Sequence, residues 1–184
     1  MGAVTQPVRI RSAVMSDSPA VREIRNRAVR ESLAIWTSRE QTPQEAAAWL
    51  EPQVARGTAL VAVEDTDSDS RVLGFAVATP WRNYEGYART VEDSVYLSPA
   101  AQGQGTGGRL LDALVTACQQ AGDRTIVAAI EAGNTVSVRL HQRHGFTVVG
   151  TIPQAGEKFG QILDLTLMSR TLPGAAPAAT FTSL

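Results

Sequence analysis

The chain has 184 residues, with 17 basic and 18 acidic side chains, a formal net charge of −1 and 43% hydrophobic residues. This length corresponds to one domain with a sizeable core, and the composition argues against disorder over most of the chain. The near-neutral charge excludes the basic footprint of a nucleic-acid or anionic-membrane binder, and the single cysteine excludes a disulfide framework and a cysteine-rich zinc site.

The first third of the chain is expected to form a strand and two helices. Residues 8–11 are typical of a short strand. A helix is predicted over residues 18–30, because a proline stands at an early helical position and apolar side chains recur at helical spacing. Thr42 precedes a proline and is followed three residues later by Glu45, which is the capping-box pattern of a second helix that ends near Gly57.

The rest of the chain alternates strands with helices. A polar turn at residues 65–70 separates two apolar runs and predicts an antiparallel hairpin. Strands are expected over residues 58–64, 71–79, 91–97, 125–131, 146–152 and 161–168, and helices over residues 109–121 and 134–144. This order predicts an α+β fold with a central, twisted, mixed but mostly antiparallel seven-stranded sheet and helices on both faces.

Both ends of the chain fall outside this pattern. Residues 173–184 are rich in proline, alanine and threonine, and residues 1–7 precede the first strand. Both segments are expected to be flexible termini of a single domain over residues 8–172. No apolar run approaches the roughly 20 residues that span a bilayer, and no signal peptide is visible. A cytoplasmic protein that binds no membrane is therefore expected.

A glycine-rich turn follows the strand at 91–97 and precedes a helix. Its residues are Gln102, Gly103, Gln104, Gly105, Thr106, Gly107 and Gly108. Glycines let backbone N–H groups converge, and the helix behind them adds partial positive charge, so the turn suits a pyrophosphate. The turn lacks the Gly-Lys-Ser/Thr ending of a P-loop. The dinucleotide spacing is present but lies past mid-chain after a hairpin, and this interpretation stays open beside that of a plain glycine-rich loop.

The chain resembles the GNAT acyl-CoA N-acyltransferases. Gln102, Gly105 and Gly107 match the Q/R-x-x-G-x-G/A signature of that superfamily, and the element order matches its fold. Further stretches resemble the phosphinothricin and methionine sulfoximine acetyltransferase branch. They are AIW at 34–36, PWR at 80–82, EGY at 85–87, TVEDSVYL at 90–97, AAIE at 128–131 with Asn134, LH and GF within 140–146, KFG at 158–160 and LDL at 163–165.

The resemblance implies an enzyme that transfers an acetyl group from acetyl-CoA, without a metal, to the α-amino group of phosphinothricin, methionine sulfoximine or methionine sulfone. The backbone of Gly103 to Gly108 would hold the pyrophosphate. The backbone of Val95, Tyr96 and Leu97 would pair with the pantetheine arm where strands 91–97 and 125–131 splay apart. Asn134 matches the residue that holds the pantetheine amide, and an N-cap role is equally compatible with its position.

The family's catalytic glutamate corresponds to Glu92. Strand alternation puts Glu92, Ser94 and Tyr96 on one face and Asp93 on the other. Glu92 is expected to accept the ammonium proton, directly or through water, or else to bind the ammonium only. Asp93 departs from the family pattern and would either tune Glu92 or bind substrate. The oxyanion donor is expected to be a backbone N–H of Tyr96 or Leu97.

Two histidines precede the closing strands. His141 occupies the position of a general acid for the thiolate, and it could equally be a packed helix residue. His144 is expected to have no role.

Substrate contacts are expected from polar residues of the 80–94 region and from two residues elsewhere. Arg82 is the expected carboxylate clamp, because a guanidinium binds a carboxylate in bidentate fashion. The resemblance adds Asn83, Tyr84, Glu92, Asp93 and Ser94, with Trp36 as an aromatic wall and Lys158 on a loop between the last two strands. Trp36 is also compatible with a plain core position.

The resemblance further implies a homodimer that acts on a small-molecule amine, with neither nucleic acid nor membrane as partner. Acetylation of another amine, such as a polyamine or a protein N-terminus, remains an alternative, as does a non-catalytic acyl-CoA sensor. The sequence alone leaves open the physiological substrate, the directness of proton transfer to Glu92 and the role of His141.

Overall fold

The structure is a computed structural model that describes residues 8–65 and 70–174. The predicted tail residues 1–7 and 175–184 and most of the predicted turn at 65–70 lie outside the described residues. The strands are β1 (Val8–Ser12), β2 (Ala59–Asp65), β3 (Ser70–Pro80), β4 (Thr90–Leu97), β5 (Thr125–Glu131), β6 (Thr147–Lys158) and β7 (Gln161–Thr171). The helices are α1 (Ser18–Glu31), α2 (Pro43–Arg56), α3 (Thr106–Gln120) and α4 (Thr135–Arg143), with short 3-10 helices at Met15–Asp17, Glu85–Tyr87 and Pro99–Ala101.

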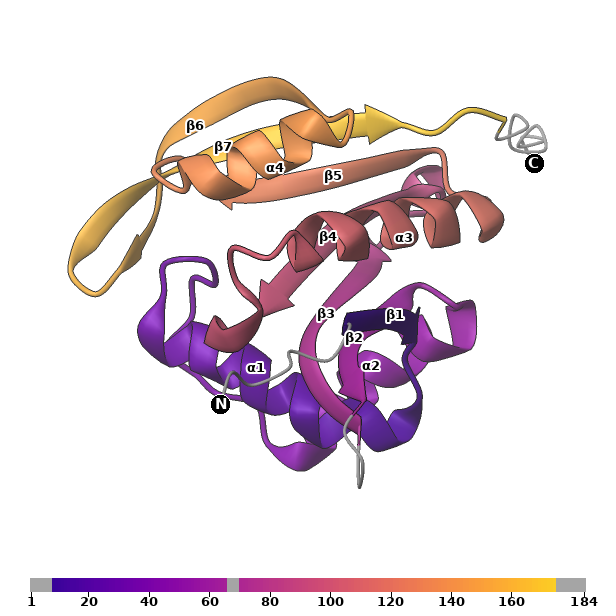
Figure 1. The fold of residues 1–184 in the computed structure, drawn as a ribbon. Helices are drawn as coiled ribbons and strands as arrows, with labels where there is room; N and C mark the ends of the chain where they lie inside the picture. The colour runs from indigo at the N-terminus through magenta and orange to yellow at the C-terminus, as the bar shows by residue number, and fades with distance from the viewer. Residues whose placement is uncertain (1–7, 66–69, 175–184) are drawn as a thin grey trace.

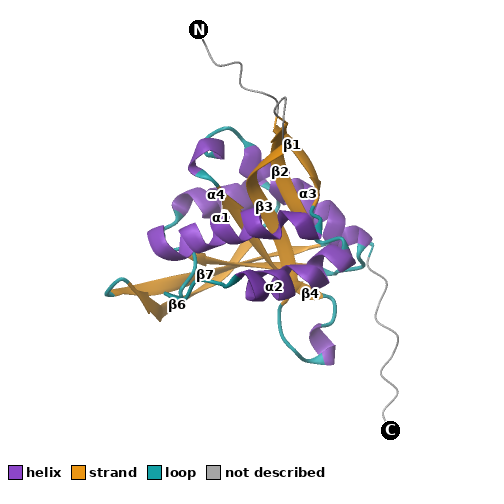
Figure 2. Ribbon diagram, turned by 90° about the horizontal axis from the view of Figure 1, so that it is seen from below, coloured by secondary structure: helices purple, strands orange, loops and turns teal. Residues whose placement is uncertain are grey.

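The seven strands form one sheet in the order β1-β2-β3-β4-β5-β7-β6. Strands β4 and β5 pair in parallel, and every other neighbouring pair is antiparallel. Helices α1 and α2 cover one face of the sheet, and α3 and α4 cover the other (Figures 1 and 2). The predicted α+β architecture, with a mostly antiparallel seven-stranded sheet and helices on both faces, is therefore confirmed.

Each face of the sheet has its own apolar core. Leu110, Leu111 and Leu114 of α3 are fully buried against one face, and Leu50 of α2 packs with Phe75 of β3 on the other. Within the described residues, no helix has the length and apolar character needed to cross a membrane.

The predicted start and end of α2 are confirmed. The Thr42 hydroxyl accepts a hydrogen bond from the Glu45 N–H at 3.2 Å, and the Glu45 carboxylate accepts one from the Thr42 N–H at 2.9 Å. Gly57 ends the helix with φ of 75°, a left-handed conformation that glycine adopts without strain. This local chemistry fixes the end of the loop that joins α1 to α2.

The sheet opens between β4 and β5. Only Thr90 to Glu92 of β4 pair with β5, whereas β3 pairs with β4 as far as Leu97. The β5-facing edge of residues 93–97 therefore has no strand partner, as predicted for the splayed strands. Backbone groups on that edge can pair with an extended ligand.

Three predicted boundaries are wrong. Strand β7 continues to Thr171 rather than ending at residue 168. Helix α3 begins at Thr106 rather than at residue 109, so the last two glycines of the turn are helical. Strand β6 continues to Lys158 rather than ending at residue 152. Its pairing with β7 breaks after Ile152 and resumes at Gly156. The hairpin is therefore long enough to reach the loop between α1 and α2 (Figure 1).

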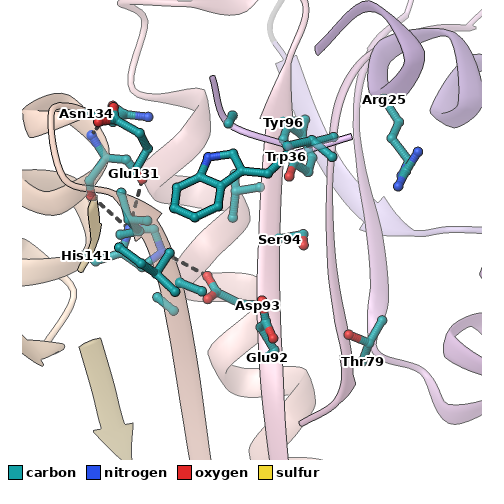
Figure 3. Close-up of a pocket in the computed structure, with 18 of the residues that line it drawn as sticks. Arg25, Trp36, Thr79, Glu92, Asp93, Ser94, Tyr96, Glu131, Asn134 and His141 are labelled. Atoms are coloured by element: carbon teal, nitrogen blue, oxygen red, sulfur yellow. Dashed lines mark hydrogen bonds and ion pairs between the residues drawn. The ribbon is translucent and has the colours of Figure 1, made fainter. Parts of the chain in front are cut away.

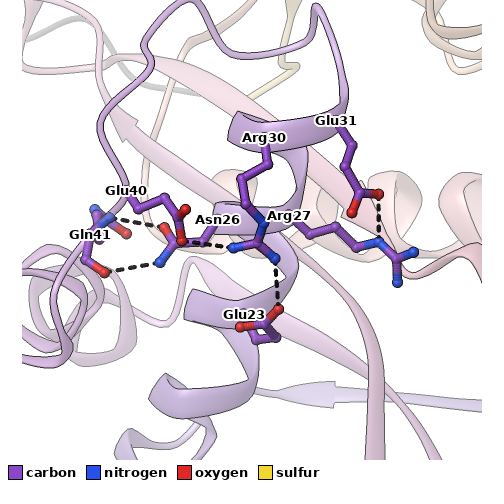
Figure 4. Close-up of polar contacts among 7 residues, drawn as sticks. All are labelled: Glu23, Asn26, Arg27, Arg30, Glu31, Glu40 and Gln41. Atoms are coloured by element: carbon purple, nitrogen blue, oxygen red, sulfur yellow. Dashed lines mark hydrogen bonds and ion pairs between the residues drawn. The ribbon is translucent and has the colours of Figure 1, made fainter.

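The loop between α1 and α2 is tied back to α1 by polar contacts (Figure 4). The buried Asn26 side chain donates to the Gln41 carbonyl and accepts from the Gln41 N–H, both at 2.9 Å. On the outer surface, Arg30 pairs with Glu23 at 3.0 Å and with Glu40 at 2.7 Å. The buried Asn26 contacts hold the far end of the segment that carries Trp36, whereas the Arg30 pairs are exposed to solvent.

Candidate active site

Two adjoining hollows lie where the sheet opens. The β4–β5 cavity, of about 380 Å³, is lined by residues of β4 and β5, by α1 and by Trp36. The α3–α4 groove, of about 490 Å³, runs between α1, α4 and the start of α3. Residues shared by both linings include Val95, Tyr96, Asn134 and His141. A ligand in the groove can therefore reach the cavity where these residues meet.

The glycine turn lies at one end of the α3–α4 groove. Gly103 and Gly105 have φ of 73° and 76°, a left-handed conformation that side chains rarely adopt. The first N–H groups of α3 have no partner within the helix, as at every helix start. Gln102 and Gly107 line the groove. Backbone donors at a helix N-terminus thus meet a groove, which is the arrangement that binds a pyrophosphate.

The side chains of Gln104 and Thr106 turn away from a ligand. Gln104 donates its amide to the Ala100 carbonyl at 2.8 Å, and Thr106 is only 1% exposed. Of these two residues, the backbone rather than the side chain is therefore available to a ligand in the groove.

His144, expected to have no role, packs against the glycine turn. A Cβ at Gly108 would stand 2.8 Å from His144 Nε2, so only glycine fits there without a shift. His144 Nδ1 also contacts the Asp112 carboxylate at 2.5 Å. The imidazole therefore sets how closely α4 approaches the start of α3.

Asn134 caps helix α4. Its Oδ1 accepts a hydrogen bond from the Ser137 N–H at 3.0 Å, which confirms the N-cap interpretation. The residue also lines both hollows. Because Oδ1 serves the cap, Nδ2 is the atom that can donate to a ligand.

Glu92 lines the β4–β5 cavity together with Ser94 (Figure 3). Burial raises the pKa of the Glu92 carboxyl above its usual range, the charge of Asp93 raises it further, and the Arg82 guanidinium opposes both. The predicted strand alternation is confirmed, because Tyr96 packs with Phe75 in the core under α1 and α2. A half-buried carboxylate whose pKa is raised is a stronger base than an ordinary glutamate.

Asp93 and His141 form a buried ion pair across the opening of the sheet (Figure 3). His141 Nε2 lies 2.8 Å from Asp93 Oδ2, and the two side chains are 5% and 2% exposed. His141 Nδ1 lies 2.8 Å from the Ser137 carbonyl oxygen. With Asp93 ionised, both neighbours accept hydrogen bonds, so this arrangement favours a ring that donates from both nitrogens, an imidazolium.

The charge of Asp93 holds His141 in this cationic form. Burial alone lowers the pKa of His141, but the hydrogen bond and charge of Asp93 and the Ser137 carbonyl together raise it above its ordinary value. The Nε2 proton is already donated to Asp93, so His141 is less free as an acid than its position suggests. The pairing itself was missed, because the residues are 48 positions apart and only the fold places α4 beside β4.

The structure does not bring three of the predicted substrate residues to the cavity lining. Arg82, Asn83 and Tyr84 are exposed on the loop after β3, and Arg82 stacks on the Trp81 ring at 5.0 Å. Arg82 acts on the site at longer range, through its effect on the pKa of Glu92. Trp36, Glu92, Asp93 and Ser94 do line the cavity.

Lys158 also lies away from the cavity lining. It is buried at the end of β6, and its ammonium donates to the carbonyl oxygens of Val29, Ser32 and Ile35 at 2.7, 2.7 and 2.6 Å. It thereby caps the C-terminal end of α1 and holds the segment that carries Trp36. Lys158 therefore supports the cavity wall from outside the cavity lining.

Replacing Lys158 with methionine is expected to lower the free energy of unfolding by about 3 kcal/mol, because buried carbonyl oxygens lose a charged donor. Urea unfolding measures this change. Glu157→Gln, at the exposed neighbouring position, serves as control and should stay within about 0.5 kcal/mol of wild type. Equal stability of the Lys158→Met variant and this control would contradict the assignment.

Arg25 is a cavity residue that sequence reasoning missed. It lines the β4–β5 cavity from α1. The available signal was its spacing: Arg25 lies four residues after Val21 and four before Val29, both of which are buried. An arginine on the inward stripe of an amphipathic helix is unusual enough to indicate a site.

Comparison with known proteins agrees with this geometry. The acetyltransferase (GNAT) family model matches residues 20–146. A methionine sulfoximine/methionine sulfone acetyltransferase from Salmonella typhimurium is 41% identical over 171 residues, covering 92% of this chain and 98% of that protein. A phosphinothricin N-acetyltransferase from Streptomyces coelicolor is 33% identical over 168 residues, covering 91% and 98%. The structure of a Salmonella typhimurium acetyltransferase with its cofactor acetyl-CoA matches with a TM-score of 0.87 at 40% identity, covering 95% of this chain and 100% of that one.

A sheet opened beside a glycine turn defines a class of acyl-transferring enzymes, and the chain belongs to the GNAT acetyltransferase family. It is an N-acetyltransferase. Within that family, the predicted similarity to the methionine sulfoximine and phosphinothricin acetyltransferases is confirmed.

Proposed function

We propose that this enzyme, acting through a single domain over residues 8–172, acetylates the α-amino group of methionine sulfoximine, methionine sulfone or phosphinothricin with acetyl-CoA. The observation that carries the proposal is the half-buried carboxylate of Glu92 in a cavity that adjoins the α3–α4 groove. The relatives named for these substrates support the choice of amine.

The cofactor is proposed to occupy the α3–α4 groove. The N–H groups at the start of α3 would receive its pyrophosphate. Its pantetheine arm would pair with the free edge of Val95 to Leu97, and Asn134 Nδ2 would donate to a pantetheine carbonyl. The apolar side chains of Val136 and Leu140 line the same groove and suit the methylene parts of that arm.

Glu92 is proposed as the base. It accepts one proton from the substrate ammonium, directly or through water, and leaves a neutral amine. The nitrogen then attacks the thioester carbonyl and forms the C–N bond, and a backbone N–H of Tyr96 or Leu97 stabilises the resulting oxyanion. Collapse of this tetrahedral intermediate breaks the C–S bond and releases the thiolate. The amine's second proton reaches the thiolate, so the products are the acetylated amino acid, the CoA thiol and one proton on Glu92 that passes to solvent.

Thiol release from acetyl-CoA tests the proposal, with methionine sulfone, methionine sulfoximine, phosphinothricin and spermidine assayed in parallel. Turnover of at least one amino-acid analogue without turnover of spermidine is expected. Turnover of spermidine alone would indicate a polyamine acetyltransferase. Tight acetyl-CoA binding without turnover of any amine would favour an acyl-CoA sensor.

A homodimer is proposed from the exposed apolar surface of the β6–β7 hairpin. Its large apolar side chains are 47% to 68% exposed, and they are Val148, Val149, Ile152, Phe159 and Ile162. Exposed large apolar side chains in this number on one hairpin suit contact with a second copy of the same hairpin. Sedimentation is expected to give twice the chain mass of 19.6 kDa, and a species of single chain mass would contradict the proposal.

A further inference from the structure

One arginine of α1 faces the β4–β5 cavity. Arg25 lines the cavity, and its guanidinium lies 5.8 Å from the centre of the Trp49 ring. Its Nη1 is buried without a hydrogen-bond partner, and no carboxylate among the described residues forms an ion pair with it. A buried charge is costly when nothing pairs with it.

The outward-facing arginines of the same helix behave differently. Arg27 pairs with Glu31 at 2.8 Å, and Arg30 pairs with Glu23 and Glu40 (Figure 4). Helix α1 therefore carries paired arginines on its solvent side, whereas Arg22 and Arg25 each have a buried nitrogen without a hydrogen-bond partner, and of these two only Arg25 lines the cavity. Burial lowers the pKa of Arg25, yet a guanidinium keeps its charge in proteins. An anion entering the cavity would complete its hydrogen bonds.

The position of Arg25 along β4 decides which part of a substrate it can reach. Figure 3 shows Arg25 toward the Tyr96 end of the strand, whereas Glu92 and Thr79 lie toward the other end. A strand rises by about 3.3 Å per residue, so Ser94 and Tyr96 stand about 7 and 13 Å along the strand from Glu92. An α-carboxylate shares a carbon with the amine and therefore stays close to Glu92. The head group of an extended side chain lies farther along the strand, toward the end where Arg25 lies.

We propose that Arg25 is a specificity-determining residue that binds an anionic head group, a phosphinate or carboxylate, at the end of the substrate's side chain. This inference rests on the proposed function, because it assumes that the α-amine lies at Glu92. A guanidinium binds such oxyanions through two parallel hydrogen bonds. A neutral sulfone of similar size offers hydrogen-bond acceptors without a negative charge, so its interaction with Arg25 is weaker. The enzyme should therefore prefer phosphinothricin to methionine sulfone.

The test compares kcat/KM for phosphinothricin and for methionine sulfone in four proteins: wild type, Arg25→Gln, Arg25→Lys and Arg30→Gln. Loss of a charge-assisted contact is expected to lower kcat/KM for phosphinothricin by about 10- to 100-fold in Arg25→Gln. The value for methionine sulfone should change by less than about threefold. Arg25→Lys keeps the positive charge but not the two parallel hydrogen bonds of a guanidinium. Its kcat/KM for phosphinothricin should therefore lie between those of wild type and Arg25→Gln. Arg30→Gln, on the outer face of the same helix, should match wild type.

An unchanged ratio between the two substrates in Arg25→Gln would overturn the inference, and so would a wild-type preference for the sulfone. If neither substrate turns over, the proposed function fails, and calorimetric binding of phosphinothricin still decides the role of Arg25. Weaker binding to Arg25→Gln than to Arg30→Gln would then support it, and equal binding would overturn it. Should Arg25→Gln fail to fold, the same comparisons are made with Arg25→Lys.

Discussion

Replacing Glu92 with glutamine is expected to lower kcat/KM by about 100- to 10,000-fold, the range that a positioned general base contributes. Glutamine keeps the size and hydrogen-bonding capacity of the side chain but cannot accept the ammonium proton. Binding of acetyl-CoA, measured by calorimetry, should be unaffected, because Glu92 does not line the α3–α4 groove.

The pH profile separates a base from a mere ammonium partner. Burial and Asp93 raise the pKa of Glu92, so wild-type kcat/KM should rise with pH through a pKa above the usual glutamate range. The Glu92→Gln variant should lose this rising limb of the pH profile. Glu85→Gln, on the exposed 3-10 helix nearby, is the control and should keep both rate and profile. A Glu92→Gln variant that retains the limb, with only KM changed, would assign Glu92 to substrate binding alone.

Replacing Asp93 with asparagine is expected to destabilise the protein by about 3 kcal/mol at low pH, because the buried imidazolium of His141 loses its counter-ion. The direction in which this loss of stability depends on pH follows from the raised pKa of His141. Stabilisation from a raised pKa is fully present below the unfolded value of about 6.5 and disappears as pH rises through the folded pKa. The stability gap between wild type and variant should therefore narrow at alkaline pH.

Urea unfolding at several pH values measures this gap, and NMR titration of His141 should show a lowered pKa in the Asp93→Asn variant. The matched control is Asp112→Asn, because Asp112 contacts His144 in a far more exposed pair, at 63% and 18% exposure. Asp112→Asn should lower the free energy of unfolding by less than about 1 kcal/mol. The pH profile of kcat/KM gives a second readout, since removing Asp93 should also shift the Glu92 limb to lower pH. Equal effects of the two substitutions would contradict a buried ionic pair.

Features that depend on neighbouring residues could be predicted from the sequence. The capping box of Thr42 and Glu45 and the glycine turn at 102–108 consist of contacts within a few residues, so their pattern is readable directly. The end of β6 could not be read in this way. Residues 153–156 (PQAG) carry the pattern of a turn. In the structure they form a register shift within β6, which resumes its pairing with β7 at Gly156.

The features that could not be predicted from the sequence depend on contacts between residues far apart in the chain. Lys158 reaches Val29 across 129 positions, and no local pattern indicates that its ammonium caps a helix. The sequence placed Arg82 in the substrate site by resemblance, whereas the structure lines the cavity with Arg25 from a helix that the motifs do not include. The placement of α1 against the sheet and the β6–β7 hairpin decides both cases, and that placement is a property of the whole fold.

The most direct test of the central claim is to identify the product by NMR and mass spectrometry after incubation with acetyl-CoA and methionine sulfone or phosphinothricin. We predict an acetyl group on the α-nitrogen, formed in equal amount to the CoA thiol, and neither product with the Glu92→Gln variant. Thiol release without an acetylated amino acid, or acetylation that the glutamine variant performs equally well, would contradict the account.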